Sequence, residues 1–176
     1  MSKENLVNAF NILLRDGQEI DEQNMGNIYN SNDSIKDIVD WFKAAKPEPT
    51  KKDICTQIGV NLEEVSEMAS AIKANNLSEI INEAATYLKQ ANEEGVDKYI
   101  KDFDDVELLD AICDQIVTAV GVGYMMGFDV EGALKEVIRS NNSKMVDGKF
   151  IFDENAKIAK PKTFSEPNLK PFLGDE

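Results

Sequence analysis

One segment, residues 105–126, constrains the fold of this chain more than any other. Apolar residues occupy most positions around its helical circumference: Leu108, Leu109, Ala111, Ile112, Ile116, Val117, Ala119 and Val120. A helix that is apolar on nearly every side belongs in the middle of a bundle rather than at its surface. The segment therefore predicts an all-α fold with this helix at its centre.

Further helices are predicted from apolar residues three and four positions apart and from capping and breaking residues. We expect helices over residues 3–16, 34–45, 51–74, 78–94 and 130–140. Ser34 is the expected cap of the second, Ser78 opens the fourth, which closes near Gly95, and Asp129 caps the last. Residues 96–103 are expected to form a connection or an additional helical turn. The fold class is thus an all-α helical bundle of about five to six helices.

The end of the chain differs in composition from the helical part. Residues 135–170 hold eight of the 19 basic residues, and the segment from 141 onward contains three prolines and the turn sequence Asp147-Gly148. Proline and Asp-Gly punctuate extended chain and turns rather than helices. We therefore predict a helical domain over 1–140 and an extended, basic, proline-containing tail over 141–176.

Two acid clusters lie on predicted helices. Their members are Glu63, Glu64 and Glu67 in the first, and Glu107, Asp110 and Asp114 in the second. This spacing places each cluster on one stripe of its helix, where like charges repel by roughly 0.2–0.5 kcal/mol per pair. No Lys or Arg occurs between residues 52 and 73 or between residues 101 and 135. A divalent cation is the natural source of the compensating charge.

The chemistry of these side chains narrows the choice of metal. All-oxygen ligands on rigid helices suit Mg²⁺, or Mn²⁺ as a substitute, because these ions keep several waters and complete their shells with substrate phosphates. The alternative for either cluster taken singly is a solvated helix face. The chain has no histidine, which excludes the usual zinc sites and Ser-His-Asp triads.

Charge and hydropathy exclude other classes of partner. A net charge of −14 argues against binding to nucleic acid backbones, and no apolar run approaches the length of a membrane span. The two cysteines, Cys55 and Cys113, lie in apolar helical patterns without a signal peptide. They are typical of reduced core thiols, so a cytoplasmic location is expected, in the host cytoplasm if the protein is phage-encoded.

The order of these pieces resembles that of the all-α nucleotide pyrophosphohydrolases, the MazG-like and dCTPase-like group that includes phosphoribosyl-ATP pyrophosphohydrolase-like phage proteins. The hallmark of this group, Glu-x-x-Glu on one helix and Glu-x-x-Asp on another, is matched by residues 64–67 and 107–110. Residues 139–149 look like its "SNMSKL…DGK" segment, and residues 40–47 more weakly like its aromatic-rich segment. Two departures are the 39 residues between the motifs, from 68 to 106, and Phe42 in place of a histidine.

The resemblance implies a Mg²⁺-dependent enzyme that cleaves a nucleoside triphosphate between its α- and β-phosphates. It implies metal ligands at Glu64, Glu67, Glu107, Asp110 and Asp114, and catalytic roles for Glu63, Glu64 and Glu67. Substrate contacts are expected from Trp41, Arg139, Asn141, Lys144 and Lys149, although Trp41 also fits a core or interface position. A homodimer or homotetramer is implied as well, with the identity of the base left open.

Two other functions fit parts of the same sequence. An acidic interaction protein that mimics the charge of DNA would explain the net charge, but it would spread its acids over an exposed face. A nucleotide sensor would keep the fold and bind nucleotide without turnover. Both remain alternatives to the hydrolase on the sequence alone.

Overall fold

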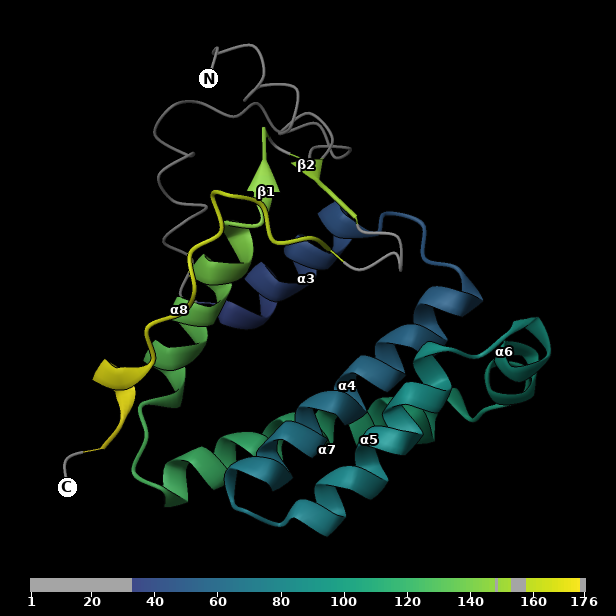
Figure 1. Ribbon diagram of the computed structural model, residues 1–176, viewed down its shortest axis with the longest axis horizontal. Helices are drawn as coiled ribbons and strands as arrows, with labels where there is room; N and C mark the ends of the chain where they lie inside the picture. Colours follow the sequence, from purple (N-terminus) through teal and green to yellow (C-terminus); the bar gives the residue numbers. More distant parts are fainter. Residues whose placement is uncertain (1–32, 148, 153–157, 175–176) are drawn as a thin grey trace. The chain divides into compact units, whose positions relative to one another are not determined.

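The computed structural model describes residues 33–147, 149–152 and 158–174 (Figure 1), so the predicted helix over 3–16 lies outside the described residues. The described residues form the helices α3 (Ser34–Ala45), α4 (Lys51–Ala71), α5 (Asn75–Lys89), α6 (Glu93–Ile100), α7 (Asp105–Met125) and α8 (Val130–Asn142). Short strands β1 (Met145–Val146) and β2 (Lys149–Phe150) and the 3-10 turn η1 (Lys170–Phe172) follow. The predicted all-α fold class is confirmed.

The chain divides into two compact units. Residues Glu48–Gln115 form one of them, called here the hairpin unit, and the described residues before 48 and after 115 form the other, called here the tail unit. The hairpin unit contains α4, α5, α6 and the first half of α7. The predicted boundary after residue 140 stays a prediction.

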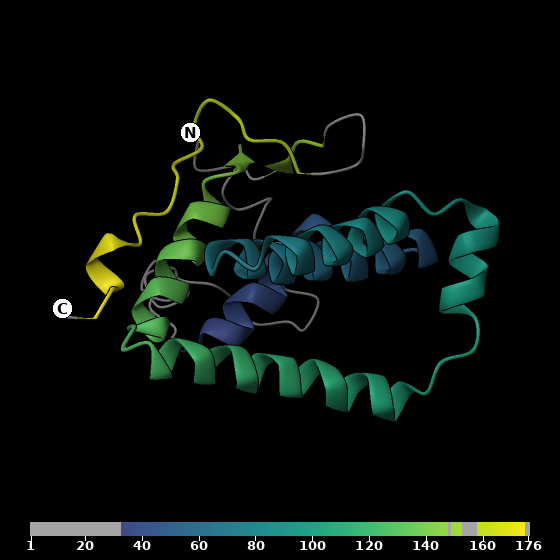
Figure 2. The ribbon, with the colours of Figure 1, turned by 60° about the horizontal axis from the view of Figure 1, so that its bottom comes forward.

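The hairpin unit is organised by α4 and α5, which run side by side in Figures 1 and 2. A capping box starts α4: the Thr50 hydroxyl accepts from the Asp53 amide, and the Asp53 carboxylate accepts from the Thr50 amide at 3.0 Å. The helix ends at Ala71, and Lys73, at φ 63°, makes the turn into α5. These local signals place α4 close to its predicted range of 51–74.

Small residues let the axes of α4 and α5 approach closely. The buried residues on α4 are Cys55, Gly59, Ser66 and Ala69, and the buried residue on α5 is Ala85. The Ser66 hydroxyl donates to the Ser78 carbonyl at 2.8 Å, which satisfies a polar group inside the contact. Cys55 also packs with Val96 and Ile100 of α6.

The predicted helix over 78–94 is wrong at both ends. The helix α5 begins at Asn75 without a side-chain cap, and Ser78 lies inside it, with its hydroxyl 3.0 Å from that of Ser66. It ends at Lys89, where the Lys52 ammonium donates to the carbonyls of Lys89 and Ala91. A new helix, α6, then starts because the Asn92 side chain accepts from the Gly95 amide. Gly95 therefore lies within a helix rather than after one.

In the tail unit, α3 and α8 pack together, and β2 lies on α3. Asp33 caps α3 by accepting from the Lys36 amide at 3.0 Å, so the prediction of Ser34 as the cap is wrong by one residue. Asp129 caps α8, as predicted, by accepting from the Gly132 amide. Strands β1 and β2 pair antiparallel on either side of Asp147, which has a φ of 49° and makes the turn that the Asp147-Gly148 sequence predicts.

Among the described residues, the expectation that α7 lies in the middle of the bundle is wrong. No residue of α7 is buried. The most exposed of its large apolar side chains are Val106 at 78%, Leu109 at 63%, Val117 at 67%, Tyr124 at 80% and Met125 at 85%. The apolar pattern gives the helical range almost unchanged, but the residues that the structure describes leave this helix unburied.

Candidate functional site

The first acid cluster lies on α4 and is only partly open to solvent. Glu64 and Glu67 are exposed, whereas Glu63 is half-buried. The Lys89 ammonium of α5 lies 2.7 Å from the Glu63 carboxylate, and the two side chains are 14% and 30% exposed, respectively. The basic partner that the sequence around Glu63 lacks is therefore supplied by the neighbouring helix.

Gly59 explains how Lys89 reaches Glu63. A Cβ at residue 59 would lie 2.8 Å from Cγ of Lys89 and 2.7 Å from the carbonyl oxygen of Ala85. The absence of a side chain at this position lets the stem of Lys89 cross α4, one turn before Glu63. The ion pair is thus a product of close helix packing as well as of charge.

The second acid cluster lies on α7, with Glu107, Asp110 and Asp114 all exposed. The helix begins at Asp105, and Asp104 accepts from the amides of Val106 and Glu107 at 2.9 and 3.0 Å. The acids follow this cap within the first three turns of the helix. They form the predicted stripe on the helix surface.

The structure does not bring the two acid clusters together. Within residues 33–147, 149–152 and 158–174, no three acidic or cysteine side chains are grouped so that they could hold a metal ion. Carboxylates suit Mg²⁺ in kind, but the ion needs its oxygen ligands around one point at about 2.0–2.1 Å. The candidate ligands suit the ion in chemistry, and within the described residues no three of them are grouped around one point, so no catalytic step through a metal is derived from this geometry.

Arg139, a candidate phosphate contact in the tail unit, is engaged in holding the tail. Its guanidinium donates two hydrogen bonds to Glu136, at 2.7 and 2.8 Å, and a third to the carbonyl of Glu166 at 3.1 Å. The Glu136 carboxylate also accepts from the Asn168 amide at 2.8 Å. The hydrogen bonds from Arg139 and Asn168 lower the pKa of Glu136 to about 2.

Asn141 and Lys144 lie in a second cluster, where the end of α8 meets the tail. The Lys144 ammonium donates to the Asn141 side chain at 2.8 Å and lies 5.8 Å from the centre of the Phe164 ring. Lys160 lies 4.8 Å from the same ring centre. Two ammonium groups on one aromatic ring are a chemically sound place for an anion, since the ring stabilises cations without neutralising them.

Trp41 and Lys149 lie at the two-stranded sheet of β1 and β2 in the tail unit. The ring of Trp41 contacts those of Phe42 and Phe150 edge-on, at 5.0 and 5.1 Å between centroids. Its indole Nε1 is buried and has no hydrogen-bond partner among the described residues. Lys149 is exposed on β2. The packing supports the core interpretation of Trp41, and the indole N–H is a donor that a ligand could use.

The sequence alone did not assign a site role to Lys89, Lys160 or Phe164. Lys89 is 26 residues from Glu63, so a search for neighbouring bases misses it, although Gly59 in an apolar helix is a signal of close approach. Phe164 lies 20 residues from Lys144, beyond the reach of helical periodicity. Each of these contacts depends on tertiary packing.

Comparison with known proteins gives no match. No family model, no curated protein and no solved structure matches the chain. A search of the described helices for membrane spans finds none that is both long and apolar enough by itself; α7 and α8 pass that test only as a pair bent by 118°.

Proposed function

We propose that this protein is a metal-dependent nucleoside triphosphate pyrophosphohydrolase. It cleaves a ribo- or deoxynucleoside triphosphate between the α- and β-phosphates and releases the monophosphate and pyrophosphate. The observation that carries the proposal is the pair of acid motifs, residues 64–67 on α4 and 107–110 on α7, in an all-α chain. The first and last residue of each motif is acidic and solvent-exposed, and therefore accessible to a ligand.

The proposed role of each residue follows from the chemistry of its side chain. Glu64, Glu67, Glu107, Asp110 and Asp114 are the proposed ligands of Mg²⁺ or Mn²⁺, which when bound would neutralise charge on the triphosphate. Glu63, which pairs with Lys89 at 2.7 Å, is held in one orientation next to Glu64 in the sequence of α4. Lys144 is the proposed phosphate contact, because its ammonium and that of Lys160 both lie within 6 Å of the centre of the Phe164 ring, at 5.8 and 4.8 Å.

Pyrophosphate release across a panel of ribo-, deoxy- and modified nucleoside triphosphates tests the proposal, with Mg²⁺, Mn²⁺ or chelator present. We expect release only with metal. Glu67→Gln and Asp110→Asn should each reduce it at least about 100-fold, the size typical of losing one group that stabilises a transition state. Glu131→Gln is the matched control, because Glu131 is an exposed acid on α8 that pairs with Lys135 at 2.7 Å.

Other outcomes identify the alternatives. Calorimetric binding of a nucleotide without turnover would replace the hydrolase with a sensor. Competition with DNA for a basic partner, unchanged by chelator, would support the acidic mimic. Absence of both binding and release for every nucleotide in the panel would rule out the proposed activity.

A homo-oligomeric assembly is part of the same proposal. An exposed apolar helix such as α7 is costly for an isolated chain in water, since each large apolar side chain gains about 1.5–3 kcal/mol on full burial. The exposed apolar residues of α7 lie along its whole length, from Val106 to Met125. Their number supports contact with further subunits.

A further inference from the structure

Residues 158–174 of the tail run along α8 in the direction opposite to that of the helix (Figures 1 and 2). Helix positions 129, 136 and 143 are each seven residues apart, about two turns, so they lie on one stripe of α8. Each of them is hydrogen-bonded to the tail. The Ser165 amide donates to the Ser143 hydroxyl at 2.9 Å, the Asn168 amide to the Glu136 carboxylate at 2.8 Å, and the Asp129 amide to the Phe172 carbonyl at 2.9 Å.

The hydrogen bond at Ser143 joins the tail to the segment that carries Lys144. Ser143 directly precedes Lys144, and Ser165 directly follows Phe164. The Ser143 hydroxyl also donates to the Ser140 carbonyl at 2.7 Å, which fixes its position at the end of α8. One hydroxyl group therefore links the last turn of α8 to the part of the tail that contains Phe164.

A turn in the tail brings Lys160 to the same aromatic ring. The Phe164 amide donates to the Pro161 carbonyl at 2.9 Å, which closes a turn directly after Lys160. The centre of the Phe164 ring lies 4.8 Å from the Lys160 ammonium and 5.8 Å from the Lys144 ammonium. The Asn141 side chain, which accepts from Lys144 at 2.8 Å, is neutral. Two cations from two segments of the chain thus meet at one ring.

The two ammonium groups suit a ligand with more than one phosphoryl group. Like charges repel, and an aromatic face attracts cations without removing their charge. Hydrogen bonds from an ammonium to a phosphate are charge-assisted and relieve this repulsion. A chain of two or three phosphoryl groups spreads its charge over a longer span than a single phosphate, so it can contact both ammonium groups at once.

We propose that Lys160 is a second phosphate contact, which acts with Lys144 on the di- or triphosphate part of a nucleotide, and that Ser143 is the positioning residue that holds Lys160 and Phe164 in place. Only the choice of a nucleotide as the ligand rests on the proposed function. Binding and tail docking are coupled, because a ligand held by both lysines also holds the tail against α8. Pyrophosphate should therefore slow hydrogen exchange of the Ser165 amide.

Pyrophosphate without added metal is the probe, because it tests the two lysines separately from the proposed metal ligands. In calorimetric titration of the full chain, Lys160→Gln should weaken pyrophosphate binding about fivefold, the effect of one ion pair near the surface. The difference should shrink as the salt concentration rises. Lys160→Arg keeps the charge and should restore most of the affinity.

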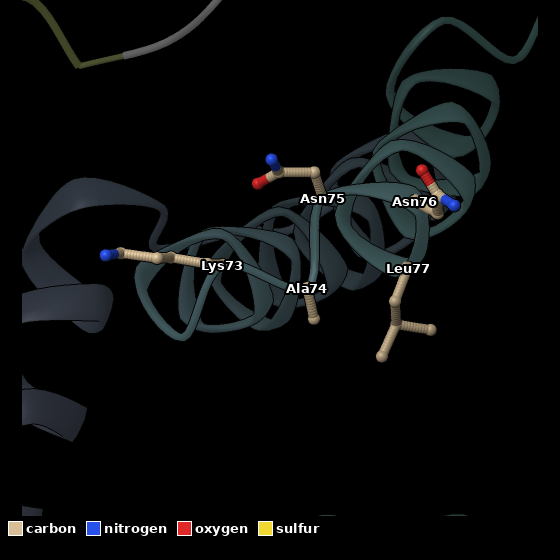
Figure 3. Close-up of a pocket in the computed structure, with 5 residues that line it drawn as sticks. All are labelled: Lys73, Ala74, Asn75, Asn76 and Leu77. Carbon is tan, nitrogen blue, oxygen red and sulfur yellow. The ribbon is translucent and has the colours of Figure 1, made fainter.

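Two control variants remove a charge elsewhere and should leave the affinity for pyrophosphate unchanged. Lys170→Gln alters the same tail at η1, near the start of α8. Lys73→Gln alters the turn between α4 and α5, where Lys73 extends away from the other side chains that line a hollow (Figure 3). Equal losses in Lys160→Gln and in both controls would show an effect of overall charge and would overturn the proposal.

Substitution of Ser143 tests its positioning role. Ser143→Ala removes the acceptor of the Ser165 amide, so it should weaken pyrophosphate binding several-fold and speed hydrogen exchange of that amide. Ser143→Thr keeps a hydroxyl group and should restore both. Ser165→Ala is the matched control, because it removes the hydroxyl of Ser165 and keeps the amide that donates. Circular dichroism checks that all variants keep their helices.

Two results separate this site from the proposed activity. Pyrophosphate binding that depends on Lys160 and Ser143, without hydrolysis of any nucleotide, would support the site and reject the hydrolase. Hydrolysis with the same KM in Lys160→Gln as in the unaltered protein would keep the hydrolase and overturn the site. Absence of pyrophosphate binding, or an affinity that Lys160→Gln leaves unchanged, would overturn the site as well.

Discussion

Two basic residues in this protein connect segments that lie far apart in the sequence. Lys89 of α5 pairs with Glu63 of α4, and Arg139 of α8 pairs with Glu136 while it holds the Glu166 carbonyl. The first contact leaves Glu64 and Glu67 as the exposed members of the acid cluster on α4. In the second contact Arg139, which was predicted to contact phosphate, is an anchor that holds the tail against α8.

The pKa of Glu136 predicts how this anchor responds to acid. Its pKa of about 2 in the folded protein lies below the ordinary value of 4.5, so the carboxylate stabilises tail docking fully above about pH 4.5 and loses this effect as the pH falls toward 2. The amide resonance of Asn168, followed by NMR from pH 6 to 2, should shift with a midpoint near 2. In Glu136→Gln this transition should be absent. A midpoint near 4.5 in the unaltered protein would contradict the anchor.

At the scale of helices, local signals in the sequence predicted most ranges correctly. The predictions of 34–45, 51–74, 105–126 and 130–140 differ from the structure by at most three residues at either end. The errors at Ser78 and Gly95 share a cause. Ser78 is a good cap by type, but its hydroxyl lies against Ser66, and Asn92 starts a helix that the apolar pattern does not reveal. Packing and side-chain hydrogen bonds therefore determine where α5 and α6 begin and end.

The close approach of α4 and α5 gives a prediction at Gly59. In Gly59→Ala the added methyl meets the Ala85 carbonyl oxygen at 2.7 Å, which is backbone and cannot move aside alone. Overpacking of this kind costs about 1–3 kcal/mol and outweighs the roughly 0.8–1.0 kcal/mol that alanine gains over glycine inside a helix. We expect a net loss of stability in urea denaturation.

Gly121 of α7 is the matched control for this substitution. A Cβ added there meets nothing within 4 Å. Gly121→Ala should therefore show the helix propensity gain alone, up to about 1 kcal/mol. If both variants were stabilised equally, the close α4–α5 contact would not exist in solution.

For the molecule as a whole, the sequence was sufficient for the fold class and insufficient for the site. Periodicity fixes which residues share a face of one helix, so the stripes of Glu64–Glu67 and Glu107–Asp110 followed directly from spacing. The distance between two such stripes depends on how the helices pack, and periodicity carries no information about that packing. The apolar pattern of α7 likewise predicted the range of the helix, but not its exposure, because none of its residues is buried in the structure.

Coupling between folding and association provides a test at this scale. If the folded chain forms the proposed homo-oligomer, raising the protein concentration stabilises the native state by mass action, by about 2.7 kcal/mol when the free concentration reaches 100 times Kd. A protein of this size gains about 2–4 °C in Tm per kcal/mol. Calorimetric scans over a 100-fold concentration range should therefore show Tm rising by several degrees. A Tm that does not change with concentration would mean that the folded chain is monomeric over this range.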